Sequence, residues 1–294
     1  MTQNVLKPLR RLGLYLDLVT FSHTIFALPF AVMALFLASP GRLPDPYDSL
    51  LVVAAMVFAR TAAMAYNRWV DRRIDAANPR TRERHLPARK VSAREVLLLV
   101  CLSALGFVLC ALALNRLAFV LSFPVLAVLL FYSHTKRFTA WSHFFLGLAL
   151  GLAPLGVWVA VRGVIDASCI LPVTLGLAVL LWVAGFDILY ACQDLEFDRK
   201  TGLRSLPARF GIGRALLSAR LLHAWVVVLL LLVAWLANLG AVYLAGVALV
   251  ALLLVYEHSL VRKDDLSRIN RAFFTVNGCV SLLLAAATVL ELLR

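Results

Sequence analysis

Three oxygen-bearing side chains recur at every fourth residue near one end of an apolar segment. Asn67, Asp71 and Asp75 have this spacing, and an α-helix places residues i, i+4 and i+8 along one face. Carboxylate and amide oxygens are the ligands that Mg²⁺ prefers, together with water and phosphate oxygens. Because like charges one helical turn apart repel each other, we expect a cation beside them. The spacing therefore predicts a magnesium site at this helix end.

A second group of carboxylates repeats the pattern in the other half of the chain. Asp194 and Asp198 have the same spacing, and Asp187 lies two helical turns upstream on that face. Each group is followed by a basic stretch with a Leu-Pro-Ala sequence, at Leu86-Pro87-Ala88 and at Leu206-Pro207-Ala208. Two segments that deliver similar carboxylates to one side of the molecule predict a single shared site.

Basic and hydroxyl groups accompany these acids. Arg60 precedes Asn67 by seven residues, which places it on the same helix face, about 10 Å deeper. Tyr132 and Lys136 are one helical turn apart and can offer a hydroxyl and an ammonium to one phosphate. Lys136 alone is equally typical of a basic residue at a span end. Together with the acids, the pair favours a diphosphate held between Mg²⁺ and basic side chains.

The elements that must carry these residues are membrane-spanning helices. The chain is 62% hydrophobic and 15% charged, with a mean hydropathy of +0.88, whereas about a quarter of the residues in a soluble domain are charged. The apolar residues form long blocks, as a helix that crosses a bilayer requires. We therefore predict an all-α integral membrane protein, a single domain over residues 1–294. Its nine helices form one bundle and span residues 14–38, 48–70, 95–114, 117–134, 141–161, 170–192, 215–237, 240–258 and 272–293.

The distribution of charge indicates how the bundle is oriented. With the N-terminus in the cytoplasm, most of the 29 Lys and Arg residues fall in loops on the cytoplasmic side. This asymmetry over short loops is the positive-inside pattern. Membrane orientation therefore explains the net charge of +13, and we expect no nucleic-acid partner. The asymmetry also predicts that both acid clusters, and hence the active site, lie at the cytoplasmic side.

The same residues carry a resemblance to a known family. The chain resembles the UbiA superfamily of intramembrane prenyltransferases over its whole length. The resemblance rests on the two acid clusters, on the Tyr132/Lys136 pair and on the run Asn78-Pro79-Arg80-Thr81 that follows the first cluster.

The resemblance implies an enzyme that transfers a prenyl group with Mg²⁺ as cofactor. Two Mg²⁺ ions would clamp the diphosphate of a polyprenyl diphosphate, and an aromatic carboxylic acid would attack the allylic carbon. Arg60 would hold the acceptor carboxylate, and Asp187 or Asp194 would activate its hydroxyl. The implied metal ligands are Asn67, Asp71, Asp75, Asp194 and Asp198, and the implied donors to the leaving group are Lys136, Tyr132, Arg199 and Lys200.

Three stretches are similar to one branch of the superfamily, the UbiA-like enzymes of futalosine-route menaquinone synthesis. They are residues 21–30, 190–194 and 205–211. The second stretch begins with Tyr190, which the resemblance implies as a substrate-binding residue. The three stretches favour a naphthoate acceptor. The alternative is 4-hydroxybenzoate polyprenyltransferase of ubiquinone synthesis. An alternative of another class is a membrane cation transporter, whose acids would line an ion path. The resemblance implies a multi-pass protein of the cell inner (cytoplasmic) membrane.

Overall fold

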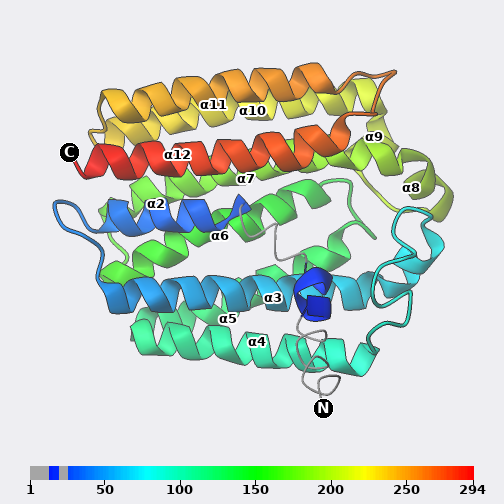
Figure 1. Ribbon diagram of the computed structural model, residues 1–294, viewed down its shortest axis with the longest axis horizontal. Helices are drawn as coiled ribbons and strands as arrows, with labels where there is room; N and C mark the ends of the chain where they lie inside the picture. Colours follow the sequence, from blue (N-terminus) through cyan, green and yellow to red (C-terminus); the bar gives the residue numbers. More distant parts are fainter. Residues whose placement is uncertain (1–12, 20–25) are drawn as a thin grey trace, which may run out of the picture.

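The computed structural model describes residues 13–19 and 26–294, which form a bundle of helices (Figure 1). Within these ranges the only strand-like pairing is an isolated bridge between Arg262 and Asp265. Eight helices of the described chain are long and apolar enough to cross a membrane. Seven of them contain α3 (Pro46–Ala77), α4 (Ala93–Leu114), α5 (Arg116–Thr135), α6 (Ser142–Arg162), α7 (Ile170–Ala191), α10 (Ile212–Leu236) and α11 (Ala241–Leu260). The eighth, Arg271–Leu292, consists of a π-helical turn, Arg271–Val276, continued by α12 (Asn277–Leu292).

These helices confirm the all-α membrane class and match eight of the nine predicted spans to within a few residues, except that α3 continues seven residues past the predicted end. The first predicted span, 14–38, is described in part: residues 13–18 are helical and α2 comprises Leu28–Ala38. Residues 20–25, with much of the stretch 21–30, lie outside the described residues, as does the N-terminal stretch 1–12. The count of nine and the orientation across the membrane therefore stay predictions.

Local sequence sets the ends of the helices that carry the site. The Asp45 side chain accepts hydrogen bonds from the N–H groups of Tyr47 and Asp48, and Pro46 occupies the first turn of α3. These are the residue types that begin helices. At the other end, Asn78 is extended and precedes Pro79, which disfavours helical geometry in the residue before it. Helix α3 therefore ends just after Asp75.

Close packing between α6 and α7 depends on glycine. A Cβ added at Gly147 would collide with the carbonyl oxygen of Leu180, and Gly151 and Gly176 each lie against the other's carbonyl oxygen. Small residues allow helix backbones to approach closely inside a membrane. Helix α7 also contacts α10 and carries buried core residues, Trp182 among them. It therefore lies at the centre of the fold.

Two connections meet at one end of the bundle. The loop 78–92 joins α3 to α4, and the segment 192–211 contains α8 (Leu195–Thr201) and α9 (Leu206–Phe210) between α7 and α10. In Figure 1 both lie at the right-hand end, where α3 and α7 finish. The fold thereby brings the two acid-bearing segments to the same end of the molecule.

Candidate active site

A cavity of about 660 Å³ opens between α3, α5, α6 and α7 and contains side chains of both acid clusters. It runs from the end of the bundle that carries the acids to the opposite ends of the helices. The predicted site residues that line it are Arg60, Asn67, Asp71, Asp75, Tyr132, Lys136, Asp187, Tyr190, Asp194 and Asp198. The two clusters, which are more than 100 residues apart in sequence, therefore share one cavity.

Asp71 is the most completely held of the acids on α3. It is buried, with 3% of its surface exposed. Lys136 Nζ lies 2.7 Å from its Oδ2, and Arg137 Nη2 lies 2.8 Å from its Oδ1. Asn67 donates to Asp71 Oδ2 over 3.3 Å, as the spacing on one helix face predicts. Lys136 comes from the end of α5, so Asp71 ties α5 to α3.

Asp75, one turn further along α3, keeps one carboxylate oxygen without a partner. Its Oδ1 accepts a hydrogen bond from Arg84 Nη1 over 2.7 Å. Its Oδ2 is buried and has no hydrogen-bond partner among the described residues. Because a buried charged oxygen is costly when it is unpaired, this atom indicates that the cavity suits a further cation.

Asp194 is bound by residues of the loop that follows α3. Arg80 donates to both carboxylate oxygens, over 3.0 Å and 2.5 Å, and Asn78 donates to Oδ1 over 3.2 Å. Arg80 also donates to the hydroxyl of Tyr190 over 3.2 Å. Burial by itself would lower the pKa of Arg80, but the hydrogen bonds and charge of Asp194 outweigh burial and raise this pKa. The run that follows the first acid cluster therefore binds the second cluster directly.

The second cluster does not lie on one continuous helix face as the spacing predicts. Helix α7 ends at Ala191, a 3₁₀ turn covers Cys192–Asp194, and Asp198 lies on the short helix α8. A 3₁₀ turn has three residues per turn and rotates the following side chains relative to an α-helix. Asp198 accepts a hydrogen bond from Ser205 Oγ over 2.8 Å and still lines the cavity.

His143 is a member of the site that sequence reasoning missed, because a lone histidine in an apolar segment is typical of packing. It is 2% exposed, and its Nδ1 lies 2.7 Å from Asp187 Oδ2. Its Nε2 accepts a hydrogen bond from the backbone N–H of Leu206. Since a neutral imidazole has one donor and one acceptor nitrogen, Nδ1 carries the proton and donates it to Asp187. His143 therefore fixes the orientation of this carboxylate.

Two residues implied by the resemblance lie outside the cavity. Arg199 donates from Nε to the carbonyl oxygen of Ala208 over 3.1 Å, and Lys200 is exposed at the end of α8. Neither lines the cavity. Arg80 and Arg84, from the loop after α3, line it instead. The signal for them was present in the sequence, since both belong to the basic stretch that follows the first acids.

The chemistry of the donor set fits a metal that shares its coordination with a substrate. Among the described residues, no three His, Cys, Asp or Glu side chains converge closely enough to hold a metal by themselves. The carboxylates are instead spread around the cavity between cationic side chains. Mg²⁺ typically takes one or two carboxylates and completes its shell with water and phosphate oxygens. The arrangement suits a polyanionic phosphate with Mg²⁺, held between acids and bases.

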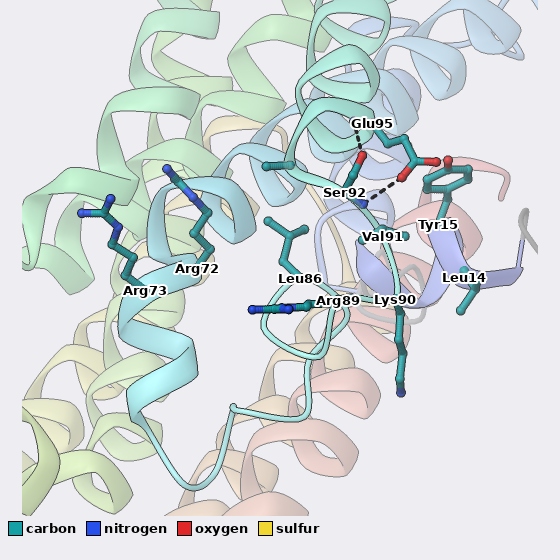
Figure 2. Close-up of a pocket in the computed structure, with 11 residues that line it drawn as sticks. Leu14, Tyr15, Arg72, Arg73, Leu86, Arg89, Lys90, Val91, Ser92 and Glu95 are labelled. Carbon is teal, nitrogen blue, oxygen red and sulfur yellow. Dashed lines mark hydrogen bonds between the residues drawn. The ribbon is translucent and has the colours of Figure 1, made fainter.

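A second cavity, of about 730 Å³, lies beside the loop 78–92 and is lined by Arg72, Arg73, Arg89 and Lys90. Figure 2 shows its one carboxylate, Glu95, directed to the backbone of Ser92, where the two residues cap α4. None of the predicted site residues lines this cavity. The first cavity, which combines acids and bases, is therefore the candidate active site.

Comparison with known proteins gives a consistent result. A sequence profile described as the UbiA prenyltransferase family matches residues 27–278. Two relatives named 4-hydroxybenzoate octaprenyltransferase are similar over most of the chain. The protein from Nitrosococcus oceani is 34% identical over 92% of this chain and 94% of its own length. The protein from Azoarcus sp. is 35% identical over 90% and 91%.

Two solved structures have the same helical arrangement. A UbiA homolog from Aeropyrum pernix superimposes with a TM-score of 0.84 at 36% identity, covering 92% of this chain and 98% of its own. A UbiA homolog from Archaeoglobus fulgidus bound to DMAPP and Mg²⁺ superimposes with a TM-score of 0.71, covering 95% and 98%. At 22% identity, the second likeness shows the fold alone.

Proposed function

The chain belongs to the UbiA prenyltransferase family, and from this premise we propose that it transfers a polyprenyl group from polyprenyl diphosphate to a ring carbon of 4-hydroxybenzoate. The reaction requires Mg²⁺, and it releases diphosphate and the proton of the ring carbon that forms the new bond. The observation that carries the proposal is the shared cavity, in which two acid clusters and several basic side chains surround one space. Enzymatic prenyl transfer and a multi-pass membrane location follow from the family. The acceptor, the metal and the residue roles are the proposal.

The choice of acceptor reverses the preference drawn from the sequence motifs. Those motifs favoured a naphthoate, whereas the relatives described above are named for 4-hydroxybenzoate. The similarity to these relatives extends over about nine-tenths of the chain and outweighs three short stretches. A cation transporter has no support from the comparisons. The proposed location is the cytoplasmic (inner) membrane, with the acid-bearing end of the bundle facing the cytoplasm.

The diphosphate would lie between the two acid clusters. Asn67, Asp71 and Asp75 on one side and Asp194 and Asp198 on the other would hold up to two Mg²⁺ ions. Bound there, Mg²⁺ would neutralise the charge that builds on the leaving diphosphate. The partnerless Oδ2 of Asp75 supports this arrangement.

Side chains from two segments, the end of α5 and the loop after α3, would act on the diphosphate as the allylic carbon–oxygen bond breaks. Lys136 and Arg80 are bound to Asp71 and Asp194 in the structure, and both line the cavity with Tyr132. Donors fixed before the reaction stabilise developing charge without a cost of reorganisation. When the bond breaks, both electrons stay with the diphosphate oxygen, and these groups stabilise it.

The aromatic acceptor would lie deeper in the cavity than the diphosphate. Arg60 lines the cavity eleven residues before Asp71 on α3, which is about 16 Å along a helix. Its guanidinium is suited to a bidentate grip on the acceptor carboxylate. Asp187, oriented by His143, would accept a hydrogen bond from the phenolic hydroxyl and so increase the electron density of the ring carbon that attacks the allylic centre.

The prenyl tail would follow an apolar extension of the same helix face. On α3 the face that carries Asn67 and Asp71 continues as Ala63, Ala59 and Ala55, all of which line the cavity. Small side chains at these positions leave room beside the helix. The extension reaches Val52, which lies about 29 Å from the level of Asp71. A long apolar groove supports a polyprenyl substrate over a short one.

The test is a product assay with the purified protein in liposomes. Octaprenyl diphosphate is supplied with 4-hydroxybenzoate or with 1,4-dihydroxy-6-naphthoate, with and without Mg²⁺, and products are identified by mass spectrometry. We expect prenylated 4-hydroxybenzoate that forms only with Mg²⁺. Transfer to the naphthoate alone would refute 4-hydroxybenzoate as the acceptor and favour the menaquinone-synthesis branch. Absence of transfer to both acceptors, from folded protein that binds prenyl diphosphate, would refute the proposed acceptor class.

A further inference from the structure

A π-helical turn, Arg271–Val276, precedes α12, and the buried side chain of Asn277 bonds to its backbone. A π-helical turn inserts an extra residue into the helical hydrogen-bond pattern and is often found at functional sites. Asn277 follows the turn directly and has no exposed surface. Its Nδ2 lies 3.1 Å and 3.2 Å from the carbonyl oxygens of Ala272 and Phe273, which share one of its two N–H donors. The side chain of Asn277 therefore fastens the turn from its C-terminal end.

The orientation of Asn277 is fixed by groups on two other helices. Trp182 Nε1 on α7 donates to its Oδ1 over 2.7 Å, and its Nδ2 donates to Glu257 Oε1 on α11 over 2.6 Å. An indole N–H can only donate, and carboxylate and carbonyl oxygens here accept. With the amide turned around, its NH₂ group would face the N–H donor of Trp182 and its oxygen would face the carboxylate oxygen of Glu257. Each hydrogen-bonding group of Asn277 thus has a defined partner.

Burial of Glu257 argues against packing as the sole role of this cluster. Glu257 has no exposed surface, and its Oε2 lies 3.4 Å from His223 Nδ1. Acids buried among membrane-spanning helices are costly and usually have a function. Neither Trp182 nor Glu257 nor Asn277 lines the active-site cavity. An effect of the cluster on the reaction must therefore pass through another residue.

Phe273 provides that connection. It belongs to the π-helical turn and lines the cavity together with Phe274. Its ring centroid lies 4.1 Å from that of Tyr190. The hydroxyl of Tyr190 accepts a hydrogen bond from Arg80, whose guanidinium lies 5.3 Å from the Tyr190 ring centroid. Arg80 in turn binds both carboxylate oxygens of Asp194.

We propose that Asn277, held by Glu257 and Trp182, is a positioning residue for the diphosphate site. It fixes the π-helical turn so that Phe273 supports Tyr190, and Tyr190 with Arg80 holds Asp194 in place for the metal and the diphosphate. The proposal rests on the proposed function in that Asp194 serves the diphosphate. It predicts that a buried residue outside the cavity controls how tightly Mg²⁺ and diphosphate bind.

The first test measures binding directly, so that it does not depend on turnover. Isothermal titration of Mg²⁺ with inorganic diphosphate is compared for wild type, Asn277→Leu and Asn277→Asp, which removes both N–H donors at constant size. We expect affinity to fall about tenfold, the lower end of the loss seen when an outer partner of a metal site is removed. Glu257→Gln retains an acceptor for Asn277 Nδ2 and should stay within about twofold of wild type.

The matched control is Thr288→Val on the same helix. Thr288 is fully buried and its hydroxyl donates to the carbonyl oxygen of Leu284, away from the π-helical turn. The Thr288→Val substitution should change thermal stability but leave the affinity for Mg²⁺ with diphosphate unchanged. If the Asn277 variants lose stability but bind as Thr288→Val does, the residue serves the fold alone and the proposal is overturned.

A double-mutant cycle tests the route through Phe273. If Asn277 acts by placing Phe273, then Asn277→Leu should add little to the loss caused by Phe273→Ala, because the two changes remove one interaction. Additive losses would refute this route. Wild-type protein that binds Mg²⁺ with diphosphate but does not prenylate 4-hydroxybenzoate would refute the proposed acceptor, while the binding comparison would still decide the role of Asn277.

Discussion

The alanine face of α3, formed by Ala55, Ala59 and Ala63, makes a graded prediction about the prenyl tail. All three line the cavity and lie one helical turn apart. Measured from Asp71 at 1.5 Å per residue, they are about 24, 18 and 12 Å along the helix. Replacement of one alanine by phenylalanine should close the groove at that depth and so limit the length of tail that fits.

The helix geometry sets the expected limits. Three main-chain bonds of an extended chain span about 3.5 Å, so the four main-chain bonds of one prenyl unit span about 5 Å. Ala63→Phe should therefore admit about two units, Ala59→Phe about three or four, and Ala55→Phe about five. Forcing extra methylene groups into filled space costs about 1–3 kcal/mol, which corresponds to about a 5- to 150-fold loss of kcat/KM. Substrates whose tails end before the introduced phenylalanine should keep nearly the wild-type kcat/KM.

The assay measures kcat/KM for geranyl, farnesyl, geranylgeranyl and octaprenyl diphosphates with each variant in liposomes. Val120→Phe on α5, whose side chain is 54% exposed, is the control for a bulky residue that does not face the cavity. Uniform loss with every substrate would mean that the substitutions disturb the site and do not shorten the groove. A chain-length preference that fails to follow the order of depth would equally refute the proposed path of the tail.

Other substitutions separate catalysis, acceptor binding and stability. Asp71→Ala or Asp194→Ala should lower kcat about a thousandfold or more while the protein stays folded by circular dichroism, because each removes a carboxylate that faces the diphosphate. The exposed Asp264→Ala should leave kcat unchanged. Arg60→Gln should raise KM for 4-hydroxybenzoate about 10- to 100-fold through loss of a charged hydrogen bond, and an equal rise in KM for the prenyl diphosphate would contradict the assigned role. Asn115 donates to the carbonyl oxygens of Val159 and Ala160 and caps α5, so Asn115→Ala should cost about 1–3 kcal/mol of stability in thermal unfolding, with kcat/KM unaffected.

The sequence by itself determined the helices and the acid ladder on α3. Long apolar blocks leave a helix as the way to pair the backbone in a bilayer. Seven predicted spans agree with helices within a few residues, and an eighth is α3, which runs seven residues further than predicted. Asn67 and Asp71 lie on one face because helical spacing is a local property. Asp45, Asn78 and Pro79 likewise set the ends of α3 through interactions with neighbours in sequence.

Only the tertiary structure decided which partners the acids take. Arg80 binds Asp194 over a separation of more than 100 residues, and His143 orients Asp187 from a neighbouring helix. Arg199 and Arg80 each follow an acid cluster in the sequence, so both could bind an anion at the site. In the structure the Arg199 side chain instead donates to the carbonyl oxygen of Ala208. Charge and spacing indicate which residues can bind an anion, but loop closure and side-chain direction select among them.

The same holds for the π-helical turn beside the site. The segment that begins at Arg271 reads as an ordinary apolar span, and nothing in its periodicity marks an extra residue in the helical turn. In the sequence Asn277 is a single polar residue in that span, with no sign of a special role. The structure shows that Trp182 from α7 and Glu257 from α11 bond to its side chain. A hydrogen-bond pattern that departs from the α-helix needs donors and acceptors from elsewhere in the chain, and only the packed bundle supplies them.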